Sequence, residues 1–137
     1  MSLVVQSADL LDQLNMLTSS WSGVRKIGLY QNDWSPERDS TIEHVEECTF
    51  AGYDGSHDLL GWSGAAMLGD SAVSYATPRL WTYNGDPPSG WVVGYFVTDS
   101  GGRLVWAERL PTGPVALVTA GQTFELTPAF ALRSRYP

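Results

Sequence analysis

One segment, Gly90–Leu110, constrains the fold most, because it predicts a β-hairpin whose first arm is apolar at nearly every position. A strand that is apolar on both faces must be covered on both sides, so the hairpin belongs inside a layered β structure. The turn Asp99–Gly102 supplies residues that tolerate positive φ, and the return arm alternates between apolar and charged side chains. The first arm is predicted to place Trp91, Val93, Tyr95 and Val97 on one face and Val92 and Phe96 on the other.

Short apolar runs separated by glycine and proline continue through the rest of the chain. They predict about seven or eight short strands with turns roughly every 8 to 12 residues, which is the spacing of all-β domains. We therefore expect a mostly β fold, an antiparallel β-sandwich or jelly-roll-like structure with a short N-terminal helix, and a small β-barrel is the alternative. The length corresponds to a single domain over residues 1–137, with the β domain over residues 25–137.

A short amphipathic helix is predicted over residues 8–18, ahead of the β domain. Ser7 precedes it as an N-cap, and Asp9 stands in the first turn, where the helix dipole favours a carboxylate. A helix of this length is marginal in isolation, so it docks either on the chain's own sheet or, as an arm, on a neighbouring subunit. Its apolar stripe consists of Leu10, Leu11, Leu14 and Leu17, and Ser19, Ser20 and Gly23 end the pattern.

Local patterns predict further elements along the β domain. Pro36 stops strand pairing after the first strand, and Pro78 divides the strands expected over residues 71–83. Ser40 and Glu43 have the spacing of a capping box, which predicts a helical piece over residues 41–47. The remaining predictions are a strand over residues 26–31, an irregular loop over 54–72, a long turn over 84–90, a hairpin of 114–120 with 122–126, and an edge strand over 130–132.

The negative charge of the chain is concentrated in one segment. Between Asp33 and Asp58 there are eight acidic residues against one basic residue, Arg38, which accounts for the whole net charge of −7. Such a surface repels phosphate backbones, so no nucleic-acid partner is expected. Outside this segment acidic and basic residues balance, and arginine, which is favoured at protein interfaces, greatly outnumbers lysine. The acidic residues are Asp33, Glu37, Asp39, Glu43, Glu46, Glu47, Asp54 and Asp58.

The number of cysteines and the length of the apolar runs indicate which classes of protein this chain can belong to. Cys48 is the single cysteine, so the fold contains no intrachain disulfide, which fits a reducing compartment or an exterior protein that is stable without disulfides. No apolar run approaches the roughly 20 residues of a membrane span, so no membrane partner is expected. The N-terminus lacks the basic segment and apolar core of a signal peptide.

Three groups of residues have the types that occur in catalytic or metal sites. Adjacent residues such as Ser56, His57 and Asp58 point apart, whereas the members of a catalytic triad converge from separated positions. His44 and Cys48 are four residues apart and could share a helical face, with Glu43 and Glu47 adding oxygens, but zinc needs three or four ligands and there is no second cysteine. The acidic segment has the residue types for Ca²⁺ but no EF-hand pattern, which favours a solvated acidic face. We predict no enzyme activity, catalytic residue, metal site or cofactor.

The six tryptophans suggest a binding function that competes with a purely structural one. Trp91 and Trp106 belong to the hairpin and are predicted to lie in the core. Trp34 and Trp62 lie in loop-like sequence, where an exposed indole would be a platform for sugar stacking. The alternative is that both indoles pack over the edge of the sheet. A glycan-binding β-sandwich module is therefore the second functional hypothesis.

Five segments follow one another in a characteristic order: Lys26–Pro36, Ser40–Ile42, Thr49–Tyr53, Gly94–Asp99 and Leu104–Glu108. This order resembles a pattern in small phage and prophage proteins, where a strand ending in Asn and Pro precedes a Thr-rich acidic turn and a Gly-Tyr dipeptide. The resemblance covers residues 26 to 132. Its motifs are structural, so it transfers no active site. It implies a virion-associated structural or accessory protein that self-assembles.

The first functional hypothesis is therefore a non-enzymatic homo-oligomer of phage type, located in a virion or in the cytoplasm, whose partners are other copies, other virion proteins or glycans. Symmetric assembly reuses one patch on every copy. The acidic face of Glu43, Glu46 and Glu47 is predicted to meet the arginine-bearing side of the next subunit in a head-to-tail ring. That side comprises Arg25, Arg79, Arg103, Arg109, Arg133 and Arg135.

Overall fold

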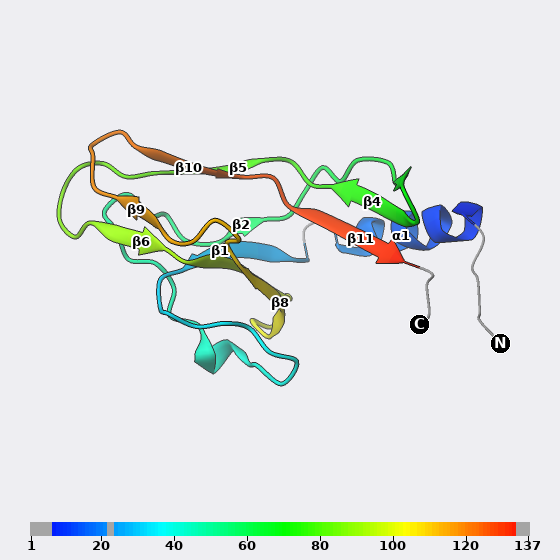
Figure 1. Ribbon diagram of the computed structural model, residues 1–137, viewed down its shortest axis with the longest axis horizontal. Helices are drawn as coiled ribbons and strands as arrows, with labels where there is room; N and C mark the ends of the chain where they lie inside the picture. The colour runs from blue at the N-terminus through cyan, green and yellow to red at the C-terminus, as the bar shows by residue number, and fades with distance from the viewer. Residues whose placement is uncertain (1–6, 22–23, 134–137) are drawn as a thin grey trace. The chain divides into compact units, whose positions relative to one another are not determined.

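The computed structural model describes residues 7–21 and 24–133, and of Ser7, Ala8, Asp9 and Arg133 it describes the backbone alone. Its described part contains eleven strands in antiparallel sheets and one α-helix near the N-terminus (Figure 1), so the predicted mostly β, sandwich-like fold is confirmed. None of the described sheets closes into a barrel. The chain forms two compact units. Of the described residues, the helix unit comprises 7–21, 24, 59–78 and 126–133, and the hairpin unit comprises 25–58 and 79–125. That residues 1–137 form a single domain stays a prediction.

In the helix unit, α1 (Ser7–Trp21) covers a three-stranded sheet in the order β11 (Ala129–Arg133), β4 (Ser71–Tyr75), β3 (Ala66–Leu68). Three leucines of the predicted stripe pack on a sheet of their own chain: Leu10 and Leu14 are buried with Ala72, and Leu11 is partly buried against them. Leu17, the fourth, is 37% exposed. The helix continues past residue 18 to Trp21, whose buried ring packs edge-to-face on Trp62 and Phe130 of the same unit. The Thr18 and Ser20 hydroxyls donate to the helix carbonyls of Leu14 and Leu17. Gly23 and the Ser7 side chain lie outside the described residues.

In the hairpin unit, the largest sheet has the order β2 (His57–Asp58), β1 (Lys26–Tyr30), β7 (Gly94–Thr98), β8 (Leu104–Arg109). Two pairs of strands accompany it: β5 (Arg79–Thr82) with β10 (Thr123–Leu126), and β6 (Gly90–Val92) with β9 (Val115–Leu117). Trp81 of β5 is buried, lies 4.9 Å from the His57 ring of β2 and donates from its indole nitrogen to the Gly55 carbonyl. Layers of sheet thus enclose the core of this unit.

The long apolar arm of the predicted hairpin is divided between two sheets. The structure places β6 and β7 on either side of Val93, so that β6 pairs with β9 while β7 pairs with β1 and β8. Val92 and Val93 are both buried, as expected for a segment covered on both sides, but the predicted alternation of faces is wrong because the chain changes sheets between them. At Gly94 a side chain would collide with the Glu108 carbonyl and the Tyr30 ring, so glycine permits this close packing.

Three other local predictions are wrong. The predicted hairpin of residues 114–126 does not pair with itself, because β9 pairs with β6 and β10 with β5. The predicted loop over residues 54–72 contains β2 and β3. The helical piece over residues 41–47 is only the 3₁₀-helix η1 (Ile42–His44), capped by Thr41, whose N–H donates to His44 Nδ1. The cap is one residue later than predicted, since Thr41 and His44 occupy the capping positions, and the Ser40 hydroxyl accepts from the Glu37 N–H at 2.9 Å.

Candidate functional site

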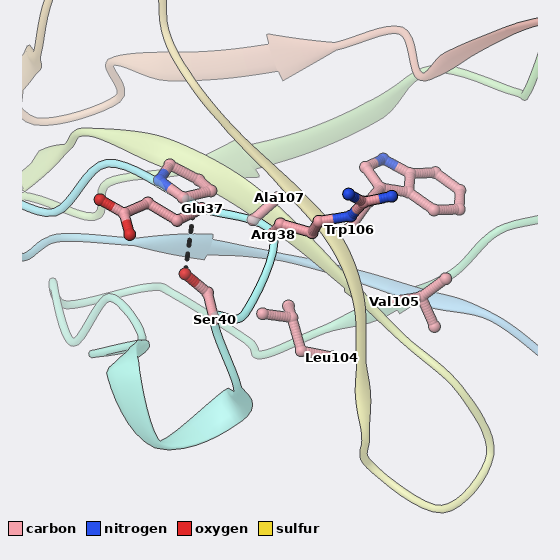
Figure 2. A pocket seen from close by; sticks show the side chains of 8 residues that line it. Glu37, Arg38, Ser40, Leu104, Val105, Trp106 and Ala107 are labelled. Atoms are coloured by element: carbon pink, nitrogen blue, oxygen red, sulfur yellow. Dashed lines mark hydrogen bonds between the residues drawn. The ribbon is translucent and has the colours of Figure 1, made fainter.

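A groove in the hairpin unit lies between the loop of residues 36–40 and the strand β8 (Figure 2). Its volume is about 340 Å³, at the lower end of the range for small-molecule sites. Because β8 is the terminal strand of its sheet, its outer edge faces this loop rather than another described strand. The groove is lined by Pro36, Glu37, Arg38 and Ser40 from the loop and by Leu104, Val105, Trp106 and Ala107 from β8.

Contacts at both ends hold the loop in place. The Arg109 guanidinium, at the end of β8, forms an ion pair with Asp33 at 2.6 Å and donates to the Ser35 hydroxyl at 3.4 Å. At the other end, the Ser40 N–H donates to the Glu37 carbonyl at 3.1 Å, which closes a tight turn. The loop is therefore held beside β8 by contacts within the chain itself, so the groove is formed before any ligand binds.

The β8 wall is held by a network behind it. The Tyr95 hydroxyl donates to the Glu108 carboxylate at 2.7 Å, and its oxygen accepts a hydrogen bond from the Trp106 indole. Burial, and then the hydrogen bond to Glu108, raise the pKa of Tyr95 above its usual value, so the phenol stays protonated at neutral pH. Trp106 is half-buried, and its orientation is fixed from the sheet side.

A second surface of the hairpin unit exposes apolar side chains. Trp91 on β6 is 57% exposed, and Val118, directly after β9, is 66% exposed. Trp91 lies opposite Ala116 in the antiparallel register, and Val118 is two residues farther along, which puts it on the same face of an extended chain. We call Trp91, Ala116 and Val118 the Trp91 face. The prediction that Trp91 lies in the core is wrong, because Trp91 belongs to β6 and the chain enters the main sheet only after Val93.

The two tryptophans predicted to bind glycans are both half-buried. Trp34 packs edge-to-face on Tyr30 at 5.1 Å and stacks on His44 at 6.3 Å. In the helix unit, Trp62 packs edge-to-face on Trp21 at 5.8 Å, and its indole N–H is buried without a hydrogen-bond partner among the described residues. Both indoles thus contribute much of their surface to packing within the chain.

The predicted acidic contact residues do not share one environment. Glu43 and Glu46 are exposed. Glu47 is half-buried and accepts hydrogen bonds from the Tyr53 hydroxyl at 2.5 Å and the Ser56 hydroxyl at 3.3 Å. Glu47 therefore has a structural role inside the hairpin unit, which leaves Glu43 and Glu46 as the predicted contact residues that face solvent.

The histidines and the cysteine have structural surroundings. His57 bonds the Asp54 carboxylate at 2.8 Å and packs on Trp81. His44 and Cys48 do not share a helical face, because η1 ends at His44 and the chain is extended at Val45. Burial, with Glu47 and Glu46 nearby, raises the pKa of the Cys48 thiol to about 12. The described residues contain no cluster of three or more His, Cys, Asp or Glu side chains placed to hold a metal ion.

Sequence reasoning missed the groove residues, and their signal was weak. Glu37 and Arg38 stood out only as charges of the acidic segment and Ser40 only as one end of a capping box, while the predicted hairpin placed Trp106 in the core. No helix in the described part of the chain has both the length and the apolar character needed to cross a membrane.

Comparison of the chain with protein-family models, with curated proteins and with solved structures found no match.

Proposed function

We propose that this chain is a non-enzymatic structural or accessory subunit that assembles with copies of itself, as the resemblance to phage and prophage proteins implies. The observation that supports this proposal is the exposure of the Trp91 face. A large indole and a neighbouring valine left in water are typical of a surface that another protein covers. Tryptophan is also the residue type that contributes most at the centres of interfaces.

The Trp91 face suits contact between identical copies. The two short strands β6 and β9 present a small residue, Ala116, directly opposite Trp91, with Val118 beside it. In a two-fold pairing, each Trp91 ring would lie over the Ala116 and Val118 side chains of the other copy. Such an isologous contact uses the same patch twice and closes as a dimer.

This apolar contact replaces the head-to-tail contact between acidic and arginine-bearing faces as the first proposal. Arg103 pairs with Asp99 at 3.1 Å, and Arg109 pairs with Asp33, both within the chain. Arg79 donates to the Asp58 carbonyl. These arginines are therefore less available to a neighbouring acidic face than their positions in the sequence implied, whereas no described contact covers most of the Trp91 ring.

Light scattering after size exclusion tests this proposal. We expect the full chain to show a mass of about twice 15.0 kDa, and Trp91→Ser to weaken self-association at least about tenfold. Leu80→Ser is the matched control, since it removes another apolar side chain that is 50% exposed in the same unit, away from the Trp91 face. A monomer at all concentrations, or an oligomer that Trp91→Ser leaves unchanged, would overturn the proposal.

A further inference from the structure

The groove between residues 36–40 and β8 carries two charged side chains that the proposed assembly does not use. Glu37 and Arg38 are exposed, and neither side chain forms an ion pair or hydrogen bond with another residue that the structure describes. Figure 2 shows them pointing in opposite directions from the loop. A carboxylate acceptor and a planar donor fork, neither with a partner among the described residues, thus stand toward opposite ends of the groove.

The opposite wall supplies apolar surface. Leu104, Val105 and Ala107 are half-buried along β8, next to the Trp106 indole. Because Tyr95 already accepts the indole hydrogen bond, Trp106 offers its hydrocarbon surface rather than its donor to the groove. A ligand here meets polar groups on one side and an apolar wall on the other.

This combination selects among ligand classes. A phosphate or another strong anion would pair with Arg38 but would meet Glu37 within a segment that carries the whole net charge of the chain. A cation would be opposed by Arg38. A wholly apolar molecule would bury the polar loop without replacing its hydrogen bonds to water, which costs free energy. A neutral polyhydroxylated molecule satisfies all of these groups, because its hydroxyls donate and accept while its C–H surface packs on the wall.

We propose that this groove binds a neutral saccharide of one or two rings. Arg38 donates to hydroxyl oxygens, and Glu37 accepts from a pair of hydroxyls in charge-assisted hydrogen bonds. Ser40 Oγ accepts from the Glu37 N–H and so keeps its own proton for the ligand. The C–H face of one ring lies against Leu104 and Trp106. This site differs from the loop tryptophans Trp34 and Trp62, whose rings are packed within the chain.

Nuclear magnetic resonance of the ¹⁵N-labelled full chain tests the site directly. The probes are neutral mono- and disaccharides, added one at a time, and the readout is the indole N–H signal of each tryptophan. We expect at least one saccharide to shift the Trp106 signal while leaving that of Trp62 in place. Trp106→Phe identifies the signal, and Arg38→Ala should weaken the binding at least about tenfold by removing charge-assisted hydrogen bonds.

Glu37→Gln and Arg103→Ala complete the design. Glu37→Gln keeps the shape but removes the charge, so it should also weaken binding, whereas Arg103→Ala removes an exposed arginine that does not line the groove and should leave binding unchanged. The proposal fails if no saccharide in the panel moves the Trp106 signal. It also fails if a saccharide binds equally well to Arg38→Ala, because the ligand would then lie elsewhere.

Discussion

The Tyr53 hydroxyl donates a 2.5 Å hydrogen bond to the Glu47 carboxylate and, through the same oxygen, accepts the Leu29 N–H at 3.2 Å. Tyr53 thereby links β1 to the segment around Glu47. An isolated β-bridge between Tyr30 and Glu47 joins the same two parts of the chain. The acidic segment is therefore attached to the main sheet by one of its own carboxylates.

Removing this hydroxyl should destabilise the chain. We expect Tyr53→Phe to lower the free energy of unfolding by about 1 to 3 kcal/mol, because the partly buried Glu47 carboxylate loses one of its two hydroxyl donors and the Leu29 N–H loses its acceptor. Urea unfolding monitored by tryptophan fluorescence measures the change. Tyr75→Phe, which removes an exposed hydroxyl, is the control and should have little effect. Equal stabilities for the two variants would contradict this account of the link.

Stability should fall in alkaline solution. Burial, followed by the hydrogen bond to Glu47, raises the pKa of Tyr53, and burial likewise raises that of Tyr95. In the unfolded chain these phenols lose their protons at about pH 10, while the folded chain still retains them. Above that pH the unfolded state therefore binds fewer protons than the folded state. The free energy of unfolding is therefore expected to decrease as the pH rises above about 10. Urea titrations from pH 8 to 11 should show a shallower decrease for Tyr53→Phe; an equal slope would refute the assignment.

Cys48 should be chemically inert in the folded chain. Its side chain is 3% exposed, its thiol lies 3.4 Å from the Trp91 carbonyl, and burial raises its pKa to about 12. The thiolate is the reactive form, so labelling with a disulfide reagent should be slow at neutral pH and fast in urea. Thr49→Cys combined with Cys48→Ser places a thiol at the exposed neighbouring position and should react rapidly when folded. Rapid labelling of Cys48 in the folded chain would contradict this prediction and would mean that the chain around Cys48 opens readily.

Gly94 should tolerate no side chain. Gly94→Ala brings a methyl group into the Glu108 carbonyl and the Tyr30 ring, so we expect a loss of roughly 1 to 3 kcal/mol or more in unfolding free energy. Gly101→Ala, in the turn between β7 and β8, is the control, because its added carbon would meet the nearest atom at an ordinary 3.5 Å. Thermal unfolding of both variants compares them. Similar melting temperatures would show that the two strands separate at Gly94 without cost.

Much of the local structure followed from patterns of neighbouring residues. The leucine spacing predicted α1, Pro78 separated β4 from β5, and the turn Asp99–Gly102 predicted the pairing of β7 with β8. In each case the cause acts within a few residues: helical periodicity, a ring that cannot donate a hydrogen bond, and glycines that accept positive φ. The mostly β class followed from the same signals summed along the chain.

The candidate sites depended on contacts between distant residues. Pairing of β6 with β9, rather than of β9 with β10, exposes Trp91, and no local pattern distinguishes those two choices. The groove exists because Arg109 holds Asp33 and Ser35 beside the edge of β8, more than seventy residues away in sequence. Sequence periodicity specified which residues can form strands, whereas the choice of partner strand depends on how side chains fill the core. That choice decided which tryptophans and charges reach solvent.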